Sequence, residues 1–130
     1  MKTIQDVLTE RQQQLIADYN YLMNENKPLG DPLVAAIRAE LCEEFYRCYH
    51  LKKVKVEWCD NSLSDKPAMT SYEGHVLHYK NMKIGKRISL NDVNFYKRMG
   101  KSKHIPMIYV RVPGNPDRSG NYPIYNIYLL

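Results

Sequence analysis

The sequence lacks any apolar run long enough to cross a membrane. No stretch approaches the roughly 20 consecutive apolar residues that a membrane-spanning helix needs. The opening residues, MKTIQDVLTERQQQ, turn polar at once and so lack the apolar centre of a signal peptide. We therefore expect a cytoplasmic protein with no membrane partner.

Motifs of the common enzyme and metal sites are also missing. The chain has no GxxxxGK[ST] or GxGxxG loop for nucleotide phosphates, no GxSxG turn for a nucleophilic serine and no EF-hand pattern. Its three cysteines, Cys42, Cys48 and Cys59, include no CxxC pair that would predict a zinc site. We therefore predict no metal and no other cofactor, and we favour a binding protein over an enzyme.

The composition of the chain is that of one folded domain. Its 130 residues are 44% apolar and 25% charged, which is typical of a globular protein with a single hydrophobic core. Tyrosine is abundant, with 11 residues against two phenylalanines and one tryptophan. Because a tyrosine hydroxyl can stay in water while its ring is buried, such rings tolerate the edge of a surface.

Residues 1–50 carry the periodicity of two amphipathic helices. Thr3 and Asp6 match a capping box ahead of an apolar stripe, so we expect a helix over about residues 4–24, with Gln12 on its solvated face. In the second helix, Asp31 is the expected N-cap and Pro32 the first helical residue. The predicted buried stripe of this helix is Leu33, Ile37, Leu41, Phe45 and Cys48.

From residue 51 onward the apolar residues alternate, which predicts strands. The run KKVKVEW is a half-buried strand, and the runs YEGHVLHYK and MKIGKRISL are expected to form a hairpin that turns near residues 80–81. A short capped helix is expected over 90–99. The remaining elements are expected to be IPMIYVRV as a central strand, PGNPDRSGNYP as a long turn and IYNIYLL as the last strand.

The order of these elements is ααβββαββ, which predicts an α+β fold in a single domain over residues 1–130. We expect the two N-terminal helices to pack on one face of a mostly antiparallel sheet of about five strands, with the short helix inserted.

Charge divides this domain into two parts. The helical residues 1–50 carry five basic and eight acidic side chains, whereas the sheet-rich residues 51–130 carry 14 and six. Between residues 80 and 103, eight basic side chains accompany a single acidic one, Asp92. The electrostatic field of such a cluster of positive charges favours an anionic partner. Tyrosines among these cations suit a surface that binds nucleic acid, because cations contact phosphates and aromatic rings stack on bases.

We therefore predict a small basic protein that binds the phosphate backbone of DNA or RNA, for example as an accessory factor of a nucleic-acid-processing complex. No RNP, KH, zinc-finger or recognition-helix signature narrows this function further. The expected phosphate contacts and stacking tyrosines are Lys83, Lys86, Arg87, Lys97, Arg98, Lys101, Lys103, Tyr79 and Tyr96.

A metal-independent ribonuclease is one alternative. His104 with His75 or His78 would supply the acid and the base, and Arg87 would stabilise the charge on the phosphorane. His75 and His78 cannot act together, because residues three apart on a strand point to opposite faces. In the order of its elements alone the chain resembles the RelE-type toxin nucleases, although no motif matches residue by residue.

A protein-interaction module is the other alternative. An acidic helical part beside a basic sheet part can dock two different surfaces of a larger machine, as an inhibitor or adaptor does.

Overall fold

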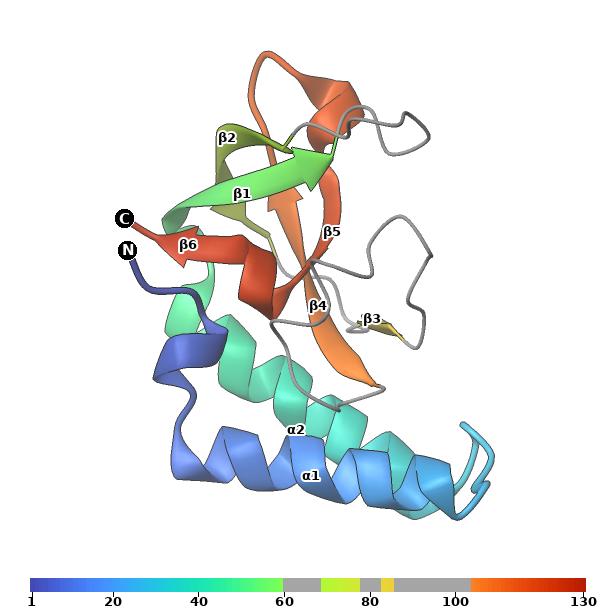
Figure 1. The fold of residues 1–130 in the computed structure, drawn as a ribbon. Coiled ribbons are helices and arrows are strands. Elements are labelled where there is room, and N and C mark those ends of the chain that lie inside the picture. Colours follow the sequence, from blue (N-terminus) through green and yellow to red (C-terminus); the bar gives the residue numbers. More distant parts are fainter. Residues whose placement is uncertain (60–68, 78–82, 86–103) are drawn as a thin grey trace.

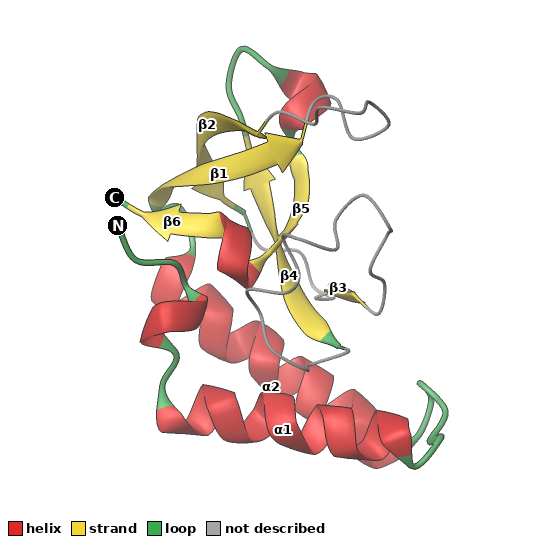
Figure 2. Cartoon of the chain, viewed as in Figure 1, coloured by secondary structure: helices red, strands yellow, loops and turns green. Residues whose placement is uncertain are grey.

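The computed structural model describes residues 1–59, 69–77, 83–85 and 104–130 (Figure 1). The two long helices are α1 (Glu10–Asn24) and α2 (Pro32–Tyr49), and the strands are β1 (Lys53–Cys59), β2 (Met69–Val76), β3 (Lys83–Gly85), β4 (Ile105–Arg111), β5 (Gly120–Pro123) and β6 (Ile127–Leu129). Single 3₁₀ turns are η1 (Gln5–Val7), η4 (Pro116–Arg118) and η5 (Ile124–Asn126). Figure 2 shows the helices below one antiparallel sheet, so the predicted α+β class is confirmed. The helix expected over 90–99 lies outside the described residues.

The start of the chain contains two reciprocal side-chain pairs in succession. The N–H of Thr3 donates to Asp6 Oδ2 at 2.9 Å and the N–H of Asp6 donates to Thr3 Oγ1 at 3.3 Å, but this predicted pair closes around η1 only. The bond from the Thr3 N–H holds the pKa of Asp6 below its ordinary value. The chain becomes extended again at Leu8, where ψ is 136°.

A second capping box, between Thr9 and Gln12, begins α1. The N–H of Gln12 donates to Thr9 Oγ1, and the N–H of Thr9 donates to Gln12 Oε1, each at 3.1 Å. The expectation that the first helix starts near residue 4 is therefore wrong, whereas its predicted end at residue 24 is confirmed. The solvated placement of Gln12 is wrong as well, because its side chain is completely buried and its Nε2 donates to Cys48 Sγ of α2 at 3.7 Å.

α2 begins where the sequence predicts. Asp31 accepts hydrogen bonds from the N–H of Leu33 at 2.9 Å and of Val34 at 3.4 Å, and Pro32 follows it. Leu33 is 56% exposed, so its predicted place in the buried stripe is taken by Val34. The rest of the buried stripe is Ile37, Leu41, Phe45 and Tyr49, so the predicted place of Cys48 in it is wrong: Cys48 is only half-buried.

β4 is the centre of the sheet. β3 pairs with residues 105–107 of β4 and β2 with residues 110–111, both along one edge, while β5 pairs with the opposite edge. The predicted hairpin is therefore wrong, because β2 and β3 line up one after the other on β4. β5 forms from the last four residues of the predicted long turn, and η5 takes the first three residues of the predicted last strand.

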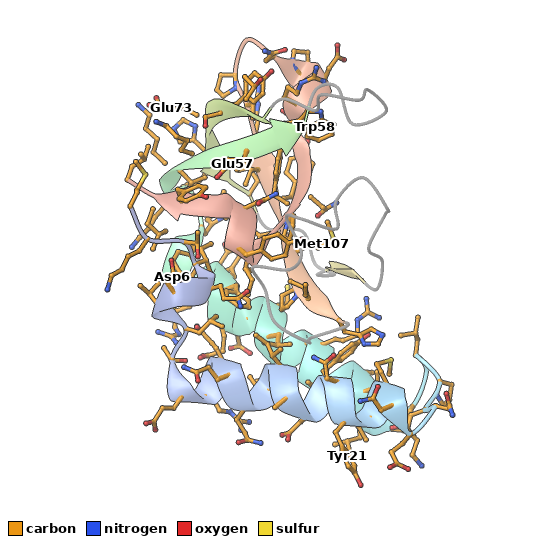
Figure 3. All side chains as sticks on the ribbon, in the orientation of Figure 1. Asp6, Tyr21, Glu57, Trp58, Glu73 and Met107 are labelled. Carbon is orange, nitrogen blue, oxygen red and sulfur yellow. The ribbon has the colours of Figure 1, made fainter. Side chains whose placement is uncertain are left out.

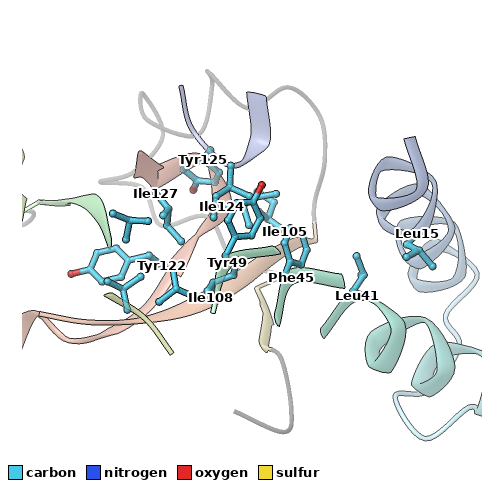
Figure 4. Packing of buried hydrophobic residues seen from close by; sticks show 14 of the residues in the cluster. Leu15, Leu41, Phe45, Tyr49, Ile105, Ile108, Tyr122, Ile124, Tyr125 and Ile127 are labelled. Carbon is cyan, nitrogen blue, oxygen red and sulfur yellow. The ribbon is translucent and has the colours of Figure 1, made fainter. Parts of the chain in front are cut away.

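The sheet is curled. β5 and β6 are separated in sequence only by η5, yet they stand at opposite ends of the strand order β5–β4–β2–β1–β6. The inner face of this curl is the hydrophobic core, into which α2 inserts Phe45 and Tyr49 beside Ile105 and Ile124 (Figure 4).

Gly74 lies on β2 where the backbone of β4 leaves no room for a side chain. A Cβ atom at this position would stand 2.5 Å from the carbonyl oxygen of Arg111 and 2.7 Å from Val110 Cγ1. The curl of the sheet thus requires a residue without a side chain on β2.

Candidate nucleic-acid interface

The positive charge of the chain lies in sequence that the structure does not describe. The described residues contain 11 basic and 11 acidic side chains, so their formal charges cancel. Segment 86–103 carries six basic side chains and one acidic one, which equals the net charge of +5 of the whole chain. We call residues 86–103 the cationic segment.

The described residues that flank the cationic segment lie at one place on the sheet. Gly85, the last residue of β3, pairs with Ile105, the first residue of β4. Asn20 of α1 then holds His104 as a neighbouring strand would: the N–H of His104 donates to Asn20 Oδ1 at 3.0 Å, and Asn20 Nδ2 donates to the carbonyl oxygen of His104 at 3.1 Å. Of the two described residues that flank the cationic segment, His104 is thus held against α1 and Gly85 is paired with β4.

Most of the predicted site residues lie outside the described part of the chain. Lys83 is the first residue of β3, opposite Met107 of β4. The predicted contacts outside the described residues are Lys86, Arg87, Lys97, Arg98, Lys101, Lys103, Tyr79 and Tyr96.

The structure does not bring the two described histidines of the ribonuclease alternative together. His104 is 7% exposed, with its ring edge-on to Tyr19 at 5.7 Å and its Nδ1 3.3 Å from Asn20 Oδ1. His75 is exposed on β2 opposite Arg111. His104 is seven residue steps along the chain from Arg111, the residue opposite His75. At a rise of about 3.3 Å per residue, the two histidines are about 23 Å apart. His78 and Arg87 lie outside the described residues.

The outer face of the sheet has both signs of charge. Its side chains come from the positions of β1, β2 and β4 that alternate with the buried ones, and Lys53 forms an ion pair with Glu73 at 3.3 Å. The charged and titratable side chains of this face are Lys53, Lys55, Glu57, Glu73, His75 and Arg111. This balance makes the outer face a weaker candidate for phosphate binding than the cationic segment.

An aromatic cluster at the tip of the inner face was not predicted as a site. Trp58 of β1 is 36% exposed, although Val54 and Val56 on the same side of this strand are completely buried. Its ring meets that of Tyr122 edge-on at 5.8 Å. The Arg118 guanidinium lies 5.2 Å from the centre of the Trp58 ring and 5.8 Å from that of Tyr72. We call these four residues the tip cluster.

Hydrogen bonds hold the Arg118 side of the tip cluster in place. Arg118 Nε donates to the Tyr72 hydroxyl at 3.4 Å, and the Tyr122 hydroxyl donates to the carbonyl oxygen of Arg118. The N–H of Val112 donates to Ser119 Oγ at 2.8 Å across the same loop. The alternation of β1 indicates the side on which Trp58 lies, but no sequence pattern places Arg118 of the long turn beside it.

One member of the tip cluster, Tyr122, lies two strands away from β3, the strand that precedes the cationic segment in the chain. Tyr122 pairs with Ile108 of β4, and β3 runs along the other edge of β4. Two strand spacings therefore separate the backbone of Tyr122 from β3, or about 10 Å. Trp58 lies far from Tyr21 of α1 in Figure 3.

A search of protein-family models, curated proteins and solved structures finds no match for this chain. Within the described ranges, His, Cys, Asp and Glu side chains form no group of three that could hold a metal ion. None of the helices in those ranges is both long and apolar enough to span a membrane.

Proposed function

We propose that this chain is a small nucleic-acid-associated protein that binds the phosphate backbone through Lys83 and the basic residues of the cationic segment. The observation that carries the proposal is the distribution of charge. The formal charges of the described residues cancel, and segment 86–103, which follows β3 and precedes β4 in the chain, carries a net charge of +5.

Such an arrangement suits phosphate binding for a simple physical reason. Each cation that neutralises a phosphate releases a condensed counterion, and each release adds to the affinity. Cations that are close together in the chain can neutralise several phosphates of one nucleic acid at once, so their contributions add up. The helical part has a net charge of −3 and is repelled by the same backbone, which orients the domain with its helices away from the nucleic acid.

Charge reversal tests this proposal. We expect Lys86→Glu with Arg87→Glu to weaken the binding of a labelled 20-nucleotide DNA or RNA by at least about tenfold at low salt, measured by fluorescence anisotropy, because two phosphate contacts become repulsions. The weakening should be equal for different sequences, since phosphate contacts carry no sequence information.

The matched control is Lys2→Glu with Lys27→Glu. Both lysines are exposed in the helical part, and the pair changes the net charge by the same amount. We expect this control to keep most of the affinity. Equal losses in the two double variants would show that only net charge matters, and no binding by the unaltered protein would refute the proposed function.

A further inference from the structure

We propose that the tip cluster is a base-stacking site, so that the nucleic acid bound by this protein is single-stranded. Trp58 stacks on one nucleobase, and Arg118 contacts the phosphate next to it. The inference rests on the proposed function and adds to it both the class of nucleic acid and a site composed only of described residues.

The exposure of Trp58 is the first step. A large aromatic side chain on the inward side of a strand is expected to be buried like its neighbours, and about a third of Trp58 stays in contact with solvent instead. Exposed aromatic rings are the feature by which proteins bind unpaired bases, because every base has a flat π face.

The packing around Trp58 is the second step. Tyr122 meets its ring edge-on and Arg118 lies over its face, so two of its neighbours fix the indole. Arg118 is in turn held against Tyr72, by the ring contact and by the bond to the hydroxyl. A ring that is already fixed loses little conformational freedom when a base stacks on it, which favours binding.

The chemistry of Arg118 is the third step. A guanidinium keeps its charge at any physiological pH, and its planar fork matches the oxygens of a phosphate while its flat face stacks on an aromatic ring. The tip cluster therefore offers a π face and a cation side by side, which is the pattern of one nucleotide. Through Tyr122, the tip cluster is two strands away from β3, which precedes the cationic segment in the chain.

Trp58 is the only tryptophan of the chain, so its fluorescence reports on this site alone. We expect single-stranded dT16 at low salt to quench the emission of Trp58 with the same Kd that anisotropy of a labelled dT16 gives. A 16-base-pair duplex should leave the emission nearly unchanged even where it binds, because its bases stay stacked in the helix.

Two variants and one control sharpen the test. Trp58→Ala should weaken dT16 binding by tenfold to about a hundredfold, within the range of aromatic stacking on a base. Trp58→Phe should recover part of that loss, because it keeps a ring. Tyr21→Ala removes an exposed aromatic ring (65% exposed) from the helical part, far from Trp58 in Figure 3, and should leave binding unchanged.

The outcomes separate the two proposals. Binding of dT16 by anisotropy without quenching of Trp58, or equal quenching by the duplex, would overturn the stacking site and leave the proposed function standing. Absence of any binding at low salt would overturn the proposed function itself. The quenching measurement uses the unaltered protein, so a variant that fails to fold does not affect it.

Discussion

The helical part and the sheet part of this molecule are stabilised in different ways. The N-terminal ends of α1 and α2 are capped by side chains that lie within three residues of each helix start. Between the two helices, Arg11 of α1 forms an ion pair with Glu40 of α2. The sheet depends on contacts between distant residues, such as β1 with β6 and β2 with β4. The two parts share one core, but they also differ in charge: the helical part is net acidic and the sheet part is net basic.

This contrast separates stability from function. The helical part carries the acidic excess, and neighbouring side chains cap the starts of its two helices, so we assign it a structural role. The sheet part presents the two features that suit a nucleic acid, which are the ends of the cationic segment and the tip cluster. Substitutions in each part should therefore have different consequences, and three of them test the contrast through the free energy of unfolding.

The largest effect is expected from Gly74→Ala in the sheet part. The added Cβ meets a backbone carbonyl that cannot rotate away, so β2 and β4 must separate. We expect a loss of about 3 kcal/mol in the free energy of unfolding, the upper end of the usual range for overpacking. Urea denaturation followed by circular dichroism measures it, and an unchanged midpoint would contradict the described approach of the two strands.

Asn20→Ala, at the junction of the two parts, should have an intermediate effect. It removes the partners of the N–H and the carbonyl of His104, and we expect a loss of about 2 kcal/mol, as for other buried polar groups left unpaired. Gln14→Ala, on the exposed side of the same helix, is the control and should change stability by less than about 0.5 kcal/mol. Equal values for the two variants would show that Asn20 does not join the parts.

The smallest effect is expected from Thr9→Ala, in the helical part. Loss of the hydroxyl that accepts the N–H of Gln12 should cost about 1 kcal/mol. Thr9→Ser keeps the accepting oxygen and should recover most of this loss. Thermal unfolding of the three proteins gives the comparison, and a serine variant as unstable as the alanine one would rule out the capping role.

The same contrast explains how much of the fold is predictable from the sequence. The N-cap of α2 and the alternation of β1 depend on neighbouring residues, and both were predicted correctly. The error at the start of α1 is also local, because two possible capping boxes follow each other and only the structure shows which one begins the long helix. The partners of β3 and the existence of β5 depend on residues far away, and these predictions failed.

The candidate site follows the same rule. The cationic segment is visible in the sequence as a run of like charge, and the structure adds the positions of the residues that flank it, Gly85 and His104. Trp58 and Arg118 are 60 positions apart in the chain, and no periodicity connects them, so only the folded sheet reveals that they touch. Asn20 escaped notice for a related reason, because its partner His104 lies 84 residues away.

The salt dependence of binding tests the central claim most directly. We predict that the logarithm of the affinity for a single-stranded 20-mer falls linearly with the logarithm of the salt concentration, with a slope of about −0.7 for each phosphate neutralised. The slope of Lys86→Glu with Arg87→Glu should be smaller in magnitude by about 1.4, the loss of two such contacts. An affinity that does not change with salt, or a slope that the double variant leaves unaltered, would contradict the account.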